Sequence, residues 1–165
     1  KSGEILRYLV IEMMQLLAAR NEARRLTRTG GQTTIQALDN NPLKFSPTPE
    51  DALRIMLGPS SKSYLDAPRA LAQAFSDLKL HQLRTYTAMQ AAMRMIAGEL
   101  DPESIEKSLA SGGGLGELLS SRKARLWDAY VARWNAKTEH LDDGLADVFM
   151  QYFADAYDSG LDGKS

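Results

Sequence analysis

The chain has 165 residues, of which 44% are hydrophobic and 25% charged, and its formal net charge at pH 7 is −1. This composition is typical of a soluble protein that is long enough to bury a core without a metal or a disulfide. Because there is no cysteine, disulfide bonds, thiolate catalysis and cysteine-ligated zinc are excluded. No apolar run reaches the roughly 20 residues of a membrane span, and the basic excess is too small for a nucleic-acid surface, so neither partner is expected.

The first predicted element is an amphipathic helix over roughly residues 3–28. Its apolar residues recur every three or four positions, as they do on one face of a helix: Ile5, Leu6, Leu9, Val10, Met13, Leu16 and Leu17. The helix dipole favours cations near a helix C-terminus, and four arginines crowd this end: Arg20, Arg24, Arg25 and Arg28. Gly30 and Gly31 are expected to end the helix, and a function for the arginine cluster is left open.

The next stretch, from about residue 29 to 48, has no helical periodicity and exceeds the usual connection of about 4–6 residues. It contains "DNNPLKFSPT". Leu43 and Phe45 are costly to leave in water, and the prolines reduce the entropy lost on ordering. Asn41 precedes a proline, which favours an extended backbone. We therefore predict a long extended strap between the first two helices, anchored by Leu43 and Phe45.

An extended strap points alternate side chains to opposite sides. Leu43 and Phe45 would then face inward, whereas Lys44 and Ser46 would face outward. The two neighbouring asparagines could bond the polar Gln82 of a later helix. The candidate partner-binding residues are accordingly Asn40, Asn41, Lys44 and Ser46.

Five further helices are predicted after the strap. Thr48 and Pro49 have the pattern of an N-cap and a first helical residue. The longest helix runs from Asp66 to about Gly98, with an apolar stripe of Leu71, Phe75, Leu78, Met89, Met93 and Ile96. A short helix starts at Asp101, and two more follow the break "SGGGLG". The prediction is an all-α fold: a compact bundle of about five to seven helices that forms one domain over residues 1–165.

No pattern of catalytic or metal-binding residues stands out. The two histidines, His81 and His140, belong to no ligand motif. Asp77 and His81 are four residues apart on a helix, and a structural pair is favoured over catalysis. The helix that carries Trp127 and Trp134 is expected to bury them, as Met89 and Met93 are expected to be buried in theirs. We therefore expect no enzyme, no cofactor and no metal.

Three stretches in order carry a resemblance to a known family: "DNNPLKFSPTPEDALRIML", "FSDLKLHQL" and "RKARLWDAY". Together they resemble the C-terminal domain of the FHA-domain accessory proteins of bacterial type VI secretion, the TagH or ImpI family. The resemblance covers essentially the whole chain. It implies a longer bacterial protein whose N-terminal forkhead-associated domain, absent from this chain, reads phosphothreonine peptides. The chain starts at Lys1 without a methionine, which fits a piece of such a protein.

The resemblance implies a cytoplasmic protein peripheral to the inner membrane at the secretion apparatus. The expected function is a non-catalytic interaction or scaffolding domain that links phosphothreonine-dependent signalling to assembly of that apparatus. Its expected partners are secretion components and the N-terminal FHA domain of the same chain. The alternative is a self-association domain that dimerises the protein, and the oligomeric state is left open.

Overall fold

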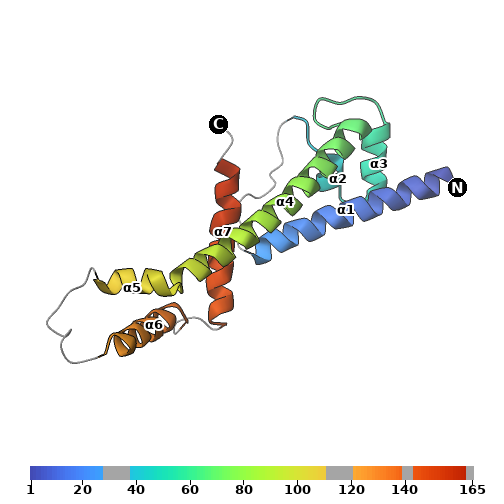
Figure 1. Ribbon diagram of the computed structural model, residues 1–165. Helices are drawn as coiled ribbons and strands as arrows, with labels where there is room; N and C mark the ends of the chain where they lie inside the picture. Colours follow the sequence, from blue (N-terminus) through green and yellow to red (C-terminus); the bar gives the residue numbers. More distant parts are fainter. Residues whose placement is uncertain (28–37, 111–120, 139–142, 163–165) are drawn as a thin grey trace. The chain divides into compact units, whose positions relative to one another are not determined.

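The computed structural model describes residues 1–27, 38–110, 121–138 and 143–162. These residues form helices and no strand (Figure 1). The helices are α1 Ser2–Leu26, α2 Pro42–Phe45, α3 Pro49–Leu57, α4 Ala67–Glu99, α5 Pro102–Ala110, α6 Arg122–Thr138 and α7 Leu145–Asp162. The predicted all-α class is confirmed. Gly30, Gly31, Arg28, His140 and the "SGGGLG" break lie outside the described residues.

The chain divides into two compact units, unit 1 (Lys1–Thr85) and unit 2 (Tyr86–Ser165). The long helix α4 contributes its first part to unit 1 and its second part to unit 2. That residues 1–165 act as a single domain stays a prediction.

Polar caps fix where two helices of unit 1 begin. The Thr48 Oγ1 accepts a hydrogen bond from the backbone N–H of Asp51 at 3.1 Å, and Pro49 takes the first position of α3. The Asp66 Oδ1 accepts one from the N–H of Arg69 at 3.0 Å at the start of α4. Both starts follow the predicted capping pattern, because a cap satisfies a backbone donor that the helix itself leaves unpaired.

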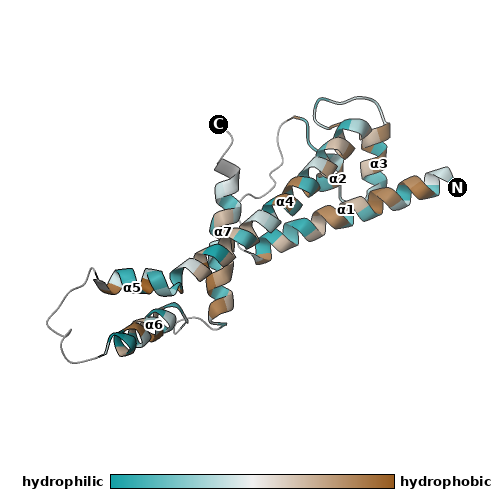
Figure 2. Cartoon of the chain, viewed as in Figure 1, coloured by the Kyte–Doolittle hydropathy of each residue, from teal (hydrophilic) through white to brown (hydrophobic). Residues whose placement is uncertain are grey.

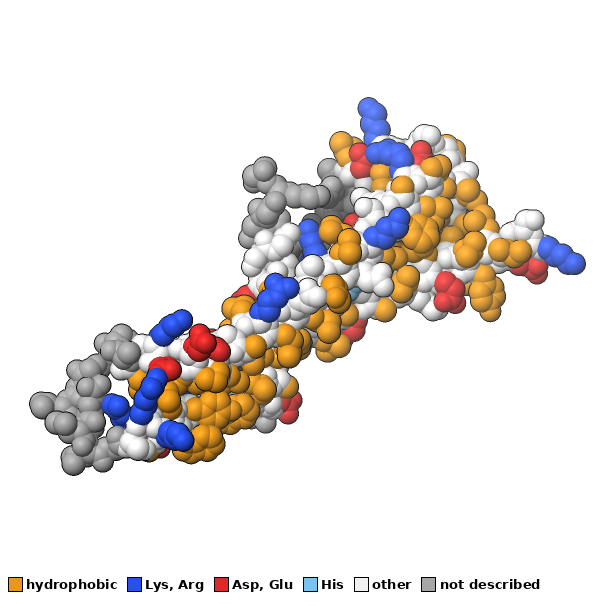
Figure 3. Space-filling view, viewed as in Figure 1, with side chains coloured by type: hydrophobic (Ala, Val, Ile, Leu, Met, Phe, Trp, Pro, Cys, Tyr) orange, Lys and Arg blue, Asp and Glu red, His pale blue; other side chains and the backbone are white. Residues whose placement is uncertain are grey.

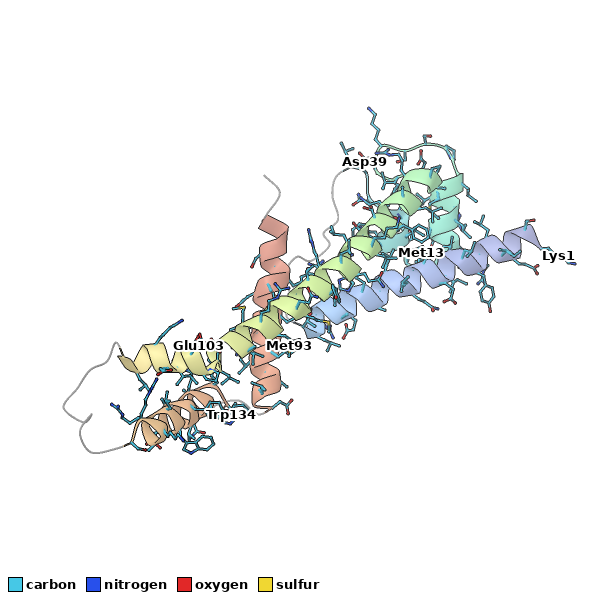
Figure 4. The ribbon with its side chains drawn as sticks, in the orientation of Figure 1. Lys1, Met13, Asp39, Met93, Glu103 and Trp134 are labelled. Carbon is cyan, nitrogen blue, oxygen red and sulfur yellow. The ribbon has the colours of Figure 1, made fainter. Side chains whose placement is uncertain are left out.

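The core of unit 1 combines residues from four helices and the segment before α4. Met13 of α1 lies among these packed side chains (Figure 4). The hydropathy colouring shows apolar and polar stretches alternating along α1 (Figure 2), as expected for a helix with one buried face. The buried residues are Val10, Met13, Leu17, Leu43, Ala52, Met56, Leu65, Ala70 and Ala74.

The core of unit 2 pairs alanines of α4 with aromatic residues of α7. Ala88 and Ala92 are buried against Phe153 and Tyr157. The Phe153 ring also stacks on Phe149, with ring centroids 6.2 Å apart. Small side chains on one helix let large rings on the other approach closely, which gives dense packing without bulky residues on both sides.

The alanine contacts correct the predicted apolar stripe of α4. Ile96 is buried as expected, but Phe75, Met89 and Met93 are 49%, 47% and 59% exposed. Buried positions of α4 are taken instead by Ala70, Ala74, Ala88 and Ala92. The prediction that Met89 and Met93 belong to the core is therefore wrong. No helix among the described residues is long and apolar enough to cross a membrane.

Candidate interaction site

The Asn-Pro segment, residues 39–46, forms a helical turn where an extended strap was predicted. The Asn41 Oδ1 accepts a hydrogen bond from the Leu43 N–H at 3.0 Å, and Pro42 occupies the first helical position. Asn41 itself keeps an extended backbone, with φ −82° and ψ 114°, as a residue before proline should. The extended strap is therefore wrong from Pro42 to Phe45, because asparagine followed by proline starts a helix here.

The Asn41 side chain also joins this turn to α4. Its Nδ2 donates to the Ala70 carbonyl and to the Gln73 Oε1, each at 2.8 Å. Only 2% of Asn41 is exposed. Both amide hydrogens and the amide oxygen of Asn41 therefore form hydrogen bonds, so this buried polar side chain leaves no donor or acceptor unpaired.

Asn40 joins the segment to the residues before α4 through backbone bonds. Its N–H donates to the Ser63 carbonyl at 2.9 Å, and its carbonyl accepts from the Leu65 N–H at 2.9 Å. Its Nδ2 also reaches the Ser63 carbonyl at 3.1 Å. Asp39, with φ 55°, begins this arrangement and pairs with Arg69 at 3.0 Å. The predicted partner of both asparagines, Gln82, is exposed and accepts none of the three hydrogen bonds that their side-chain amides donate here.

Lys44 and Ser46 do not face solvent in the way an extended strap required. The Lys44 ammonium forms an ion pair with Asp77 of α4, and only 10% of the Lys44 side chain is exposed. Ser46 is half-buried, and its hydroxyl is buried without a hydrogen-bond partner among the described residues. The outward orientation of this pair was wrong, because a helical turn rotates Lys44 toward α4 instead of away from it.

Leu43 is 2% exposed, whereas Phe45 is half-buried. The segment therefore has one fully buried apolar anchor and one partial anchor. That Asn40, Asn41, Lys44 or Ser46 contacts a partner stays a prediction. In the structure all four residues are buried or half-buried within unit 1.

Arginines of α1 lie near the histidine of α4 in unit 1. Burial lowers the pKa of His81, and the charges of Arg20 and Arg24 lower it further. The carboxylate that was expected to pair with His81, Asp77, forms its ion pair with Lys44. Arg25 pairs with Glu22 at 3.2 Å on the surface of α1.

A charged cluster joins three helices of unit 2. The Glu99 Oε1 accepts hydrogen bonds from Lys137 Nζ at 2.7 Å and from the Tyr152 hydroxyl at 2.5 Å. Burial acts to raise the pKa of Glu99, but these two hydrogen bonds and the nearby cations leave it lowered. The hydrogen bond to Glu99 is the main cause of a raised pKa at Lys137, and the hydrogen bond to Tyr152 raises it further. Each shift favours the charged form, as in a structural ion pair.

The sequence prediction missed an apolar groove in unit 2, between α5 and α6. This aromatic groove has a volume of about 400 Å³ and is lined by Leu100, Pro102, Ile105, Glu106, Lys123, Leu126, Trp127 and Tyr130. Trp127 is 64% exposed and stacks on Tyr130 with ring centroids 5.7 Å apart. The prediction that Trp127 and Trp134 are core residues is wrong, since Trp134 is also 36% exposed.

Hydrophobic side chains gather over α5 and α6 beside several cations (Figure 3). α6 starts with Arg122, Lys123 and Arg125 and has no acidic residue in its first turn. The Arg122 guanidinium forms an ion pair with Glu106 across the groove. The helix dipole disfavours positive charge at this end, and Lys123 lines the groove together with Glu106.

Among the described residues, no three histidine or acidic side chains come together as metal ligands. What the two units offer is a helical scaffold with an apolar groove on its surface.

The chain matches the family of the C-terminal domain of the Type VI secretion system FHA protein over residues 1–160. It therefore belongs to that family, as the resemblance implied. Comparison with curated proteins and with solved structures gives no match.

Proposed function

We propose that this domain is a non-catalytic interaction and scaffolding domain of a type VI secretion FHA protein. In this proposal it holds secretion components while the N-terminal FHA domain of the same protein reads phosphothreonine peptides. The two activities together link phosphorylation to assembly of the apparatus on the cytoplasmic side of the inner membrane. The observation that carries the proposal is the aromatic groove of unit 2, an exposed apolar surface with a stacked tryptophan.

The groove suits a protein segment that combines an apolar anchor with acidic residues. An exposed tryptophan is the kind of residue that dominates the energy of protein interfaces once a partner buries it. The cations at the start of α6 would attract acidic side chains, which raises the association rate and selects among partners. We therefore expect the occupant to be an acidic amphipathic segment of another secretion component.

Capture from cells that express the secretion components tests this proposal. The chain of residues 1–165 serves as bait, and bound proteins are quantified by mass spectrometry. Trp127→Ala and Lys123→Glu should each reduce capture of the same component about tenfold or more, as expected for an interface anchor and its charged neighbour. Lys79→Glu makes the same charge change at an exposed position of α4 in unit 1 and should leave capture unchanged.

The capture experiment separates the interaction function from its site. If the wild-type chain recovers no secretion component, the interaction function is wrong. If it recovers one and both groove variants recover it equally well, the function stands and the groove is not its site.

A further inference from the structure

We propose that α1 pairs with α1 of a second copy of this chain, through an exposed heptad stripe and in the antiparallel direction. This inference uses unit 1 alone and does not depend on the proposed function of the groove in unit 2. Helix α1 carries two apolar stripes, of which one is buried in the core of unit 1 and the other is exposed.

The stripe that unit 1 uses contains Val10, Met13 and Leu17, which are buried in its core. The second stripe lies one residue earlier at each step, about 100° around the helix. It repeats every three and four residues along the whole helix, the spacing that two helices need to pack together as a coiled coil. Its members are Ile5, Leu9, Glu12, Leu16, Ala19, Ala23 and Leu26, and all of them are exposed.

The large residues of the heptad stripe leave a considerable apolar surface in water. Ile5, Leu9, Leu16 and Leu26 are 62%, 63%, 53% and 70% exposed, and the adjacent Tyr8 is 67% exposed. A hollow of about 400 Å³ runs over the first half of the stripe, lined by Lys1, Glu4, Ile5, Tyr8, Leu9 and Glu12.

The area of this surface is comparable to what a dimer needs. Five half-exposed large side chains present roughly 500 Å² of apolar surface, at about 100 Å² each. A standard interface buries about 800 Å² per partner. Neighbouring alanines and the stems of polar side chains would supply much of the difference, so the heptad stripe can support a modest dimer.

The charges of α1 select a second copy in the antiparallel direction. Glu12 interrupts the middle of the stripe, and parallel pairing in register would place it against the same carboxylate of the partner. The first half of α1 carries Glu4 and Glu12 with Arg7, which pairs with Glu50. The second half carries three arginines and one acid, which pairs with the last of them: Arg20, Glu22, Arg24 and Arg25. Antiparallel pairing about the middle of the helix brings the acids of one copy beside the arginines of the other. It also opposes the two helix dipoles, and it gives a closed twofold interface in which the same patch serves both chains.

Sedimentation analysis over a range of concentrations of the purified chain tests the pairing. The wild type should show a concentration-dependent equilibrium between monomer and dimer. The double variant Leu9→Glu, Leu16→Glu should raise the dimer dissociation constant at least about tenfold, because it places charges in an apolar interface. Glu12→Leu should lower that constant, since it completes the stripe.

Leu57→Glu is the matched control for these variants. Leu57 of α3 is 64% exposed, like Leu9, but lies off the stripe. It should leave the dissociation constant unchanged. Circular dichroism melting checks that each variant stays folded. A wild-type monomer at every concentration, or a Leu57→Glu variant as impaired as the double variant, overturns the proposal.

The direction of pairing is measured separately, with a single spin label. The chain has no cysteine, and a Cβ added at Gly3 meets nothing within 4 Å, so Gly3→Cys can be labelled alone. With pairing centred near the middle of α1 and a rise of 1.5 Å per residue, antiparallel copies place the two labels about 40 Å apart. Parallel copies place them within about 20 Å of each other, at the usual interhelical distance plus two label arms. A short distance therefore overturns the antiparallel arrangement.

Discussion

Unit 1 and unit 2 hold their helices together with different chemistry. In unit 1, Asn41 is buried and its amide is fully hydrogen-bonded, which fixes the turn α2 against α4. In unit 2, alanines pack on aromatic rings, and the partly exposed cluster of Glu99, Lys137 and Tyr152 joins α4, α6 and α7. The conspicuous Asn-Pro segment of the sequence thus serves the fold of unit 1, whereas the exposed groove lies between α5 and α6 in unit 2.

Removing the buried apolar anchor of unit 1 should have the largest effect. Leu43 is only 2% exposed, so Leu43→Ala leaves a cavity in the core. It should lower the free energy of unfolding by about 3 kcal/mol. Phe45→Ala, at a half-buried position, should cost clearly less. Urea denaturation followed by circular dichroism measures both, and an equal loss would show that the two anchors are buried alike.

Reversing the charge of Lys44 should come next. Lys44→Glu places a carboxylate against Asp77, at a side chain that is only 10% exposed, and should cost about 2–3 kcal/mol. Lys44→Met removes the pair without adding repulsion and should cost less. A neutral effect of Lys44→Glu in the same urea series would mean that Lys44 faces solvent, as an extended strap would have required.

The charged cluster of unit 2 should contribute less than either change in unit 1. Glu99 and Lys137 have side chains that are 37% and 33% exposed, so solvent screens their attraction. A double-mutant cycle with Glu99→Gln and Lys137→Met should give a coupling energy of about 0.5–1 kcal/mol. A coupling several times larger would place the cluster among the main determinants of stability in unit 2.

The smallest expected effect is a pH dependence from His81. Burial and the two α1 arginines lower its pKa in the folded chain below the ordinary value of 6.5. The unfolded chain therefore takes up the proton first as the pH falls. Stability from this group is complete above about pH 6.5 and decreases as the pH falls from there toward the folded pKa. His81→Gln should flatten this slope in unfolding curves between pH 7 and 5, and an unchanged slope would assign it to other groups.

Local signals in the sequence predicted the helices well. Thr48 before Pro49 and Asp66 before α4 are capping patterns that depend only on neighbouring residues. The same logic applied to Asn41 before Pro42 gives the turn α2. The strap was predicted instead because Leu43 and Phe45, two residues apart, also fit an extended chain. Two apolar residues are too few to distinguish the periods of a helix and a strand.

The surface was harder to predict than the helices. Their large apolar side chains suggested core positions for Trp127 and Met93, but both are exposed. On α4 the buried positions near Met93 are taken by Ala88 and Ala92. Alanine is weakly hydrophobic and gives little signal in a helical pattern. Which stripe of a helix is covered depends on its neighbours, and one sequence does not show which neighbours pack there. No pattern in the sequence indicated the aromatic groove between α5 and α6.

In this structure the Asn-Pro segment holds unit 1 together, whereas the aromatic groove is a feature of the surface of unit 2. Urea denaturation of Asn41→Ala and Trp127→Ala under identical conditions compares the two roles. Asn41→Ala removes a cap and leaves the Ala70 carbonyl without its side-chain donor, so it should lose about 2–3 kcal/mol. Trp127→Ala gives up an exposed stacked ring and should lose less than about 1 kcal/mol. A Trp127→Ala variant that is less stable than Asn41→Ala would show instead that Trp127 matters more for folding than the Asn-Pro segment does.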